Sequence, residues 1–218
     1  MYLTLLALPF LGSLIAGLRG RALGSSGAQL VATLCLMTSA GLALVAFYEV
    51  ALCRSPVTVS LGQWITLGIM DVQWGFYFDD LTVAMLLPVF CVSSAVHVYS
   101  ASYMAEDPHT PRFFSYLSLF TGSMGVLVAA DSYLLMFVGW ELIGVASYLL
   151  IGFWLTRAQA QKAAVKAMCV NRVGDTALSI GFFACLWAMG SLDYATVLSI
   201  SPLFNETVLT LIGLLFLG

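Results

Sequence analysis

The chain is a succession of long apolar runs separated by short polar segments. A bilayer core about 30 Å thick requires roughly 20 apolar residues in helical form. Six runs have about this length and a seventh begins near the end: residues 2–18, 29–52, 81–103, 113–130, 133–155, 167–189, and 203 onward. Because lipid offers no hydrogen bonds to an unpaired strand edge, each run must be helical. We therefore predict an all-α integral membrane protein with about seven transmembrane helices.

Composition supports a lipid environment. Of the 218 residues, 61% are hydrophobic and 9% are charged, against roughly 25% charged residues in soluble domains. The net charge of -3 is too small and dispersed to indicate a nucleic-acid surface or a polybasic lipid-binding tail. The first apolar run has its positive charge after it, unlike a secretory signal, and is taken as a true span. The cysteines form no C-x-x-C pair and lie near no histidine cluster, so we expect no metal site and assign them to packing: Cys35, Cys53, Cys91, Cys169 and Cys185.

The connection between the second and third runs differs from the rest. Residues 53–80 alternate roughly between polar and apolar side chains and are rich in Thr, Val, Trp and Tyr, which predicts a short β-hairpin or interfacial segment. Trp64, Trp74 and Tyr77 suit an aromatic belt at the headgroups. An acidic pair follows, with Asp79 or Asp80 as the N-cap of the third span. We accordingly divide the chain into an N-terminal two-helix segment (1–78) and the start of a helical bundle (79–218).

Basic residues predict the orientation. With the N-terminus outside, the outer loops hold only Arg54, while Arg172 lies within a span. The inner loops hold Arg19, Arg21, Arg112, Arg157, Lys162 and Lys166. The positive-inside rule therefore favours an external N-terminus.

Glu141 lies near the middle of the fifth run. A carboxylate there costs about 2.5–3.5 kcal/mol on insertion scales, so it requires a specific role. One interpretation is a proton-carrying or charge-coupling site facing the bundle interior, with Gly144 and Tyr148 on the same helical face. The alternative is a structural carboxyl held neutral by hydrogen bonds to other helices.

The sixth run is preceded and entered by further charges. Arg172 and Asp175 are spaced i, i+3, so they form either a static salt bridge or a switch that opens when a proton or a neighbouring charge arrives. Lys162 and Lys166 share a face and either contribute to charge coupling or are inner-loop lysines that extend toward the membrane surface. His97, late in the third span after Pro88, is either a proton relay or a hydrogen-bonded core residue.

Four segments carry a family resemblance: WGFYFDDLTVAML, HVYSASYMAEDPHTPRFFSYLSLF, LLMFVGWELIGVASYLLIGFW and KAAVKAMCVNRVGD. In order and spacing they resemble chain 5 of NADH:ubiquinone oxidoreductase, the distal antiporter-like subunit of respiratory complex I. The resemblance covers most of the chain from about Trp74 to Asp175. The form of the second segment looks closer to mitochondrial members than to the sister antiporter-like chains of the same complex or to bacterial multisubunit cation antiporters.

The resemblance implies a non-redox subunit of a proton-translocating NADH:ubiquinone reductase in the mitochondrial inner membrane, with a bacterial plasma membrane as the alternative. Glu141 matches the family's central glutamate, and Arg172 with Asp175 matches a pair that couples charge toward the neighbouring antiporter-like chain. Lys162 and Lys166 align with preceding basic residues. No cofactor is expected in this chain, since FMN, iron-sulfur clusters and ubiquinone belong to the rest of the complex.

The family's next landmark, a lysine in a broken helix, lies beyond residue 218. We expect either a split gene, whose second product is a complementary C-terminal fragment and partner of this chain, or a truncated polypeptide, and no catalysis from this chain alone. Two other functions stay open. One is a component of a multisubunit cation/proton antiporter, and the other is a structural fragment of the distal membrane arm.

Overall fold

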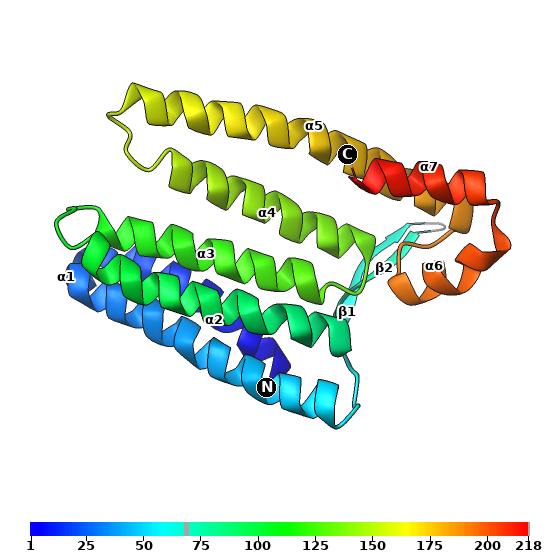
Figure 1. Ribbon diagram of the computed structural model, residues 1–218, viewed down its shortest axis with the longest axis horizontal. Helices are drawn as coiled ribbons and strands as arrows, with labels where there is room; N and C mark the ends of the chain where they lie inside the picture. The colour runs from blue at the N-terminus through cyan, green and yellow to red at the C-terminus, as the bar shows by residue number, and fades with distance from the viewer. Residues whose placement is uncertain (68–69, 218) are drawn as a thin grey trace.

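The computed structural model describes residues 1–67 and 70–217, and most of these residues form helices (Figure 1). The helices are α1 (Tyr2–Phe47), α2 (Asp80–Tyr103), α3 (Thr110–Ala129), α4 (Tyr133–Ile151), α5 (Ala158–Met189), α6 (Tyr194–Ile200) and α7 (Glu206–Leu217). A π-helical turn (Tyr48–Leu52) and a 3-10 turn (Ser201–Leu203) follow α1 and α6. Strands β1 (Val57–Leu67) and β2 (Met70–Phe78) pair antiparallel. The predicted fold class and hairpin are confirmed.

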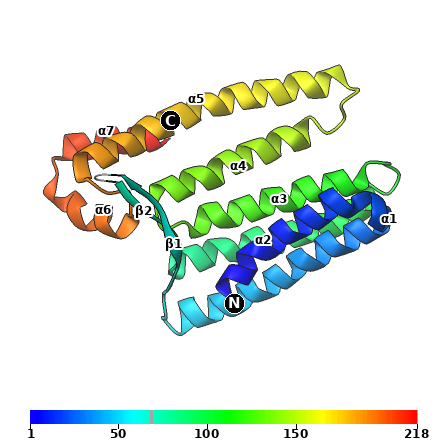
Figure 2. The same cartoon turned by 180° about the vertical axis from the view of Figure 1, so that it is seen from behind.

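Helix α1 consists of two antiparallel arms that correspond to the first two predicted spans (Figure 2). The chain reverses at Gly24, whose φ of 74° and ψ of 176° are not helical. A positive φ favours glycine because it has no Cβ to clash with the backbone. The N-terminal arm also packs closely on α3, since a Cβ at Gly20 would lie 2.6 Å from Pro111.

Among the described residues, four helical segments are long and apolar enough to cross a membrane: Tyr2–Leu52, Asp80–Tyr103, Thr110–Ala129 and Tyr133–Ile151. The first contains both arms of α1. Helix α5 is not in this group and is longer than predicted, because it begins at Ala158 rather than near residue 167. Lys162 and Lys166 therefore lie in its first turns, and the expectation that they occupy a loop was wrong. The seventh run is likewise preceded by the short α6, which was not predicted.

The β-hairpin packs against the connection between α3 and α4. Phe76 forms a β-bridge with Ala130, and a Cβ at Gly75 would overlap the Asp131 carboxylate. At the end of the hairpin, Asp79 caps α2 by accepting a hydrogen bond from the Thr82 amide at 2.8 Å, as predicted. The hairpin thereby ties α2 to the α3–α4 connection.

The chain's connections divide between two ends. The turn of α1 and the α2–α3 and α4–α5 connections lie at one end, which we call the loop end, and the hairpin and α6 lie at the other (Figure 1). The arginines that the sequence assigned to inner loops therefore lie at the loop end, and Lys162 and Lys166 lie in the adjacent turns of α5. Which end faces which compartment stays a prediction.

Helices α3 and α4 approach at Gly139, two residues before Glu141. A Cβ at Gly139 would lie 2.7 Å from both the amide nitrogen and the Cα of Leu127. Small residues allow such backbone approach between membrane helices. This contact fixes the α4 segment that carries Glu141.

We expect Gly139→Ala to destabilise the protein by about 1–3 kcal/mol, the usual cost of adding a methyl group to a packed interior. The measurement is thermal unfolding of the assembled complex. Gly41→Ala is the control, because a Cβ at Gly41 has no neighbour within 4 Å. Equal melting temperatures for the two variants would show that the close approach does not contribute to stability.

Candidate functional site

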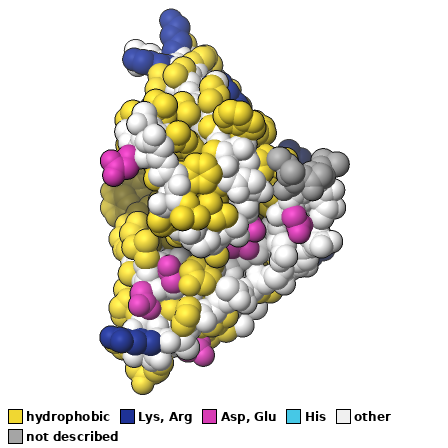
Figure 3. All heavy atoms as spheres, turned by 90° about the vertical axis from the view of Figure 1, so that its right-hand side faces the viewer, with side chains coloured by type: hydrophobic (Ala, Val, Ile, Leu, Met, Phe, Trp, Pro, Cys, Tyr) yellow, Lys and Arg dark blue, Asp and Glu magenta, His cyan; other side chains and the backbone are white. Residues whose placement is uncertain are grey.

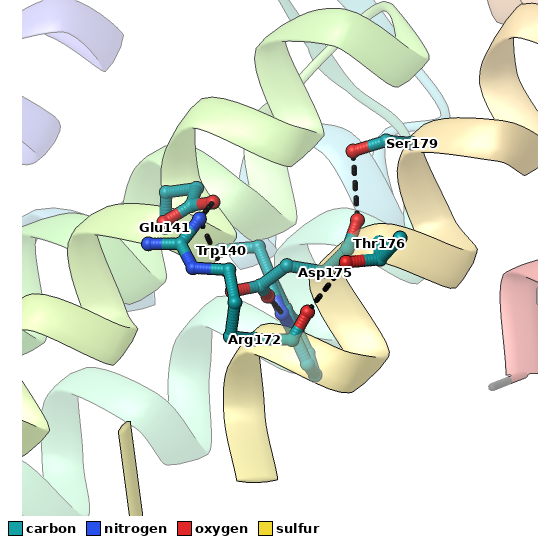
Figure 4. A network of polar contacts seen from close by, with 6 residues as sticks. All are labelled: Trp140, Glu141, Arg172, Asp175, Thr176 and Ser179. Carbon is teal, nitrogen blue, oxygen red and sulfur yellow. Dashed lines mark hydrogen bonds and ion pairs between the residues drawn. The ribbon is translucent and has the colours of Figure 1, made fainter. Parts of the chain in front are cut away.

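Helices α4 and α5 bring three predicted site residues together (Figure 4). The Arg172 Nη1 donates a hydrogen bond to Glu141 Oε1 at 2.7 Å and lies 3.8 Å from Asp175 Oδ2. Two carboxylates thus face one guanidinium, and the shorter contact is the one between helices. The predicted Arg172–Asp175 pair exists, but at 3.8 Å it is a weaker interaction than the Arg172–Glu141 contact at 2.7 Å.

Asp175 is the buried member of this network, with its side chain only 3% exposed. The Trp140 indole Nε1 donates to Asp175 Oδ1 at 2.9 Å, whereas Asp175 Oδ2 has no hydrogen-bond partner in the part of the chain described. Buried polar atoms are nearly always paired, so an unpaired one is unusual. This oxygen is an acceptor that lies beside a cation. Trp140 was not predicted as a site residue. The available signal was an indole N–H inside an apolar span, which requires an acceptor.

The other two members are more accessible. The Arg172 side chain is 55% exposed and that of Glu141 is 26% exposed on this chain. Charged groups at mid-membrane face a bundle interior or water rather than lipid tails. This side of α4 and α5 is therefore suited to protein or water and not to lipid.

Tyr148 does not contact Glu141, although both lie on α4 as predicted. It lines a cavity of about 170 Å³ between α4 and α5, together with Trp140, Gly144 and Asn171. Asn171 packs against the α4 backbone, since a Cβ at Gly144 would lie 2.5 Å from its Nδ2. The predicted face of Glu141, Gly144 and Tyr148 is thus divided, with the last two facing this cavity.

The remaining candidates lie outside the network. Lys162 and Lys166 are exposed near the start of α5 and form no salt bridge within residues 1–67 and 70–217. His97 is fully buried between α2 and α3, where Nδ1 lies 2.9 Å from the Ser93 carbonyl oxygen and Nε2 lies 3.1 Å from Ser118 Oγ. A carbonyl only accepts, so Nδ1 carries a proton, and in the neutral ring Nε2 accepts from Ser118. Of the two alternatives for His97, a proton relay or a hydrogen-bonded core residue, this geometry fits the second.

A separate acidic group lies at the hairpin end, where acidic side chains are visible on the surface (Figure 3). Burial, and then the charge of Asp193, raise the pKa of the Asp131 carboxyl. Burial, and then the charge of Asp71, raise the pKa of Asp193. The folded state therefore binds these protons more tightly than the unfolded state, and this part of the fold loses stability as pH rises through the raised pKa values.

Two protein families match separate parts of the chain. Residues 64–114 match NADH-ubiquinone oxidoreductase (complex I) chain 5 N-terminus, and residues 130–218 match the transmembrane family of NADH:quinone oxidoreductase and Mrp antiporters. NADH-ubiquinone oxidoreductase chain 5 of Cryptococcus neoformans is 63% identical over 100% of this chain. That of Mycosarcoma maydis is 61% identical, also over 100% of the chain. The chain belongs to the complex I chain 5 family.

This chain 5 member spans about a third of the length of these relatives, 33% and 32% respectively. Its fold also matches a chain in the structure of the Mrp complex from Dietzia sp. DQ12-45-1b, with a TM-score of 0.82 and 24% identity over 98% of this chain and 22% of that chain. The comparison shows that chain 5 and a chain of the Mrp complex share this helical architecture.

We expect Arg172→Gln to reduce the amount of assembled complex, because it leaves both carboxylates without a cation. Removing one partner of an ion pair is more harmful than removing both. The double variant Arg172→Gln with Glu141→Gln should therefore recover part of the loss, since Asp175 still lacks a cation. A loss of about 1–2 kcal/mol changes cellular abundance several-fold. Native electrophoresis of solubilised membranes measures this, and a double variant no better than the single one would contradict the pairing.

We expect Asp193→Asn to stabilise the packing of β2 at neutral pH and to weaken its pH dependence, because one charge that repels Asp131 is gone. The measurement is hydrogen exchange of residues 70–78 in the complex at pH 4 and pH 7, corrected for intrinsic rates. In the unchanged protein, protection should be greater at pH 4, just above the ordinary pKa of an aspartate. Glu106→Gln, at the loop end, is the control and should leave this difference as it is.

Proposed function

We propose that the chain acts in a proton-translocating subunit of respiratory complex I, forming the N-terminal part of its antiporter-like bundle. The observation that carries this proposal is the Arg172–Glu141 contact of 2.7 Å in the middle of α4. Chain 5 relatives at 61–63% identity support the assignment to complex I. In this proposal the chain is a non-redox subunit of the NADH:ubiquinone reductase, binds no cofactor, and catalyses nothing alone.

The three charges suggest a two-position mechanism. When Glu141 is ionised, it holds the Arg172 guanidinium at 2.7 Å. When Glu141 takes up a proton, this attraction ends and Asp175, already 3.8 Å away with an unpaired oxygen, is the remaining anion. The guanidinium then moves toward Asp175. Each protonation of Glu141 would thus shift one positive charge along α5 toward a neighbouring subunit.

This function requires partners. We propose that the neighbouring antiporter-like chain of complex I and the C-terminal part of the chain 5 subunit, in this or another polypeptide, cover the open side of α4 and α5. That C-terminal part would supply the lysine that works with Glu141, while Lys162 and Lys166 would lie near lipid headgroups. The location would be the mitochondrial inner membrane, with the N-terminus toward the intermembrane space.

The Mrp-like fold raises the alternative of a cation/proton antiporter. Its 24% identity indicates shared architecture only, whereas the relatives above 60% identity are NADH-ubiquinone oxidoreductase chains. Subunits that co-purify with the chain, and the sodium dependence of proton transfer, would distinguish the two functions.

We expect Glu141→Gln to leave assembly intact and to slow proton transfer through this subunit. Gln keeps an oxygen that can accept from Arg172, but its amide cannot take up and release a proton as a carboxylate does. Loss of a positioned proton-transfer group typically costs about 10²-fold or more in rate. The measurement is protons moved per NADH oxidised in sealed vesicles containing the complex.

Glu206→Gln, at an exposed acid in the first turn of α7, is the matched control and should pump normally. Normal pumping by Glu141→Gln in a fully assembled complex would instead support the structural interpretation of the charges.

A further inference from the structure

Two neighbouring residues of α4 bond to α5 in different ways (Figure 4). Glu141 accepts a hydrogen bond from the Arg172 guanidinium at 2.7 Å, and the Trp140 indole donates one to Asp175 Oδ1 at 2.9 Å. Arg172 and Asp175 are spaced i, i+3, so they are neighbours on one face of α5. The two helices are therefore joined by a charged bond and a neutral bond that end on the same pair of α5 side chains.

The Trp140 bond divides the Asp175 carboxylate between two donors. Oδ1 carries the indole bond, whereas Oδ2 lies 3.8 Å from Arg172 Nη1 and has no hydrogen-bond partner among the residues that the structure describes. An indole N–H is a neutral donor, so it satisfies one oxygen without cancelling the negative charge. The carboxylate is thus half satisfied, and its charge is still available to attract a guanidinium.

Burial gives the indole bond its influence on Arg172. The Asp175 side chain is only 3% exposed, so water has little access to replace a missing donor, and a buried acceptor without a partner is costly. Without the indole, both oxygens would depend on Arg172, and the carboxylate would attract the guanidinium more strongly. The indole bond therefore weakens the competition of Asp175 for Arg172, in agreement with the shorter contact that Arg172 makes with Glu141.

We propose that Trp140 is a positioning residue that sets how Arg172 is shared between Glu141 and Asp175. By donating to Asp175, it keeps the guanidinium on Glu141 until Glu141 takes up a proton. It also leaves Oδ2 of Asp175 free to receive the guanidinium afterwards. The inference rests on the proposed function, because it assigns a control to the movement of Arg172, and Trp140 itself carries no proton in it.

The kind of donor at position 140 matters. A lysine or arginine there would pair with Asp175, and Arg172 would lose its second acceptor. A side chain without a donor would leave two unpaired oxygens, and Arg172 would rest on Asp175. A neutral indole N–H avoids both results, and its ring also lines the cavity of about 170 Å³ between α4 and α5.

Trp140→Phe tests this positioning, because it removes the N–H and keeps an aromatic ring. The measurement is electron cryo-microscopy of the assembled complex, at one pH for all variants and at a resolution that locates the Arg172 guanidinium. We expect Arg172 to contact Glu141 in the unchanged protein and to rest on Asp175 in Trp140→Phe.

Two further variants separate the donor from the bulk of the ring. Trp154→Phe is the matched control, because that indole donates to Asp107 Oδ2 at 3.1 Å, and it should leave Arg172 on Glu141. Trp140→His keeps a ring N–H and should do the same. Equal displacement of Arg172 in Trp140→His and Trp140→Phe, or no displacement in Trp140→Phe, would overturn the proposal. If Trp140→Phe does not assemble, Trp140→Met, which has no donor and fills irregular space, is judged by the same criteria.

Proton transfer gives a second readout. With Arg172 already on Asp175, protonation of Glu141 would move it no further. We therefore expect Trp140→Phe to slow proton transfer about tenfold, the usual effect on an equilibrium of one hydrogen bond to a charged group. The rate is measured in sealed vesicles during NADH oxidation, and Trp154→Phe should be normal. A normal rate for Trp140→Phe beside a slow rate for Glu141→Gln would contradict the role assigned to Trp140.

Asp175→Asn added to Trp140→Phe should return Arg172 to Glu141, because the competing negative charge is gone. Displacement that persists in this double variant would show that Trp140 does not act through Asp175, and the inference would be wrong. The position of Arg172 is observed independently of pumping. A displaced Arg172 in Trp140→Phe, combined with normal pumping by Glu141→Gln, would therefore refute the proposed function and leave the positioning role of Trp140 standing.

Discussion

The ion pair between Arg172 and Glu141 joins α4 and α5. Between helices in lipid the hydrophobic effect provides little attraction, so polar contacts of this kind matter more. A single guanidinium serves two carboxylates, at 2.7 Å and 3.8 Å, and one oxygen of the second carboxylate is unpaired. A fully satisfied network would fix α4 and α5 in one arrangement. Here the guanidinium has two acceptors at different distances, and the mechanism proposed above uses a proton on Glu141 to reverse its preference.

Such a network requires rigid support, and the two halves of the bundle differ in this respect. In α1, α2 and α3, buried hydroxyls and His97 are hydrogen-bonded to one another or to backbone carbonyls. The approach at Gly139 then attaches α4 to this half. The unpaired Asp175 oxygen and two small cavities lie around α4 and α5. A half with many buried side-chain hydrogen bonds thus holds one side of the half that carries the charged network.

The sequence predicted those features that depend on local pattern. Apolar runs located the helices, alternation located the hairpin, and Asp79 was identified as a possible cap. It predicted the start of α5 wrongly because Lys162 and Lys166 have the composition of a loop, although their long side chains let them lie in a helix near the membrane surface. The partner of Trp140 and the separation of Tyr148 from Glu141 could not be predicted, since periodicity gives a helical face but not which residue of the next helix it meets. The Arg172–Glu141 contact spans 31 positions and has no local signature.

Trp140 and Arg172 approach Asp175 at different oxygens. The Trp140 indole can only donate, and it bonds to Oδ1, whereas Arg172 lies 3.8 Å from Oδ2. Arg172 can therefore pair with this carboxylate while the indole bond remains. Trp140 thus holds the buried carboxylate in position and leaves one of its oxygens for the guanidinium.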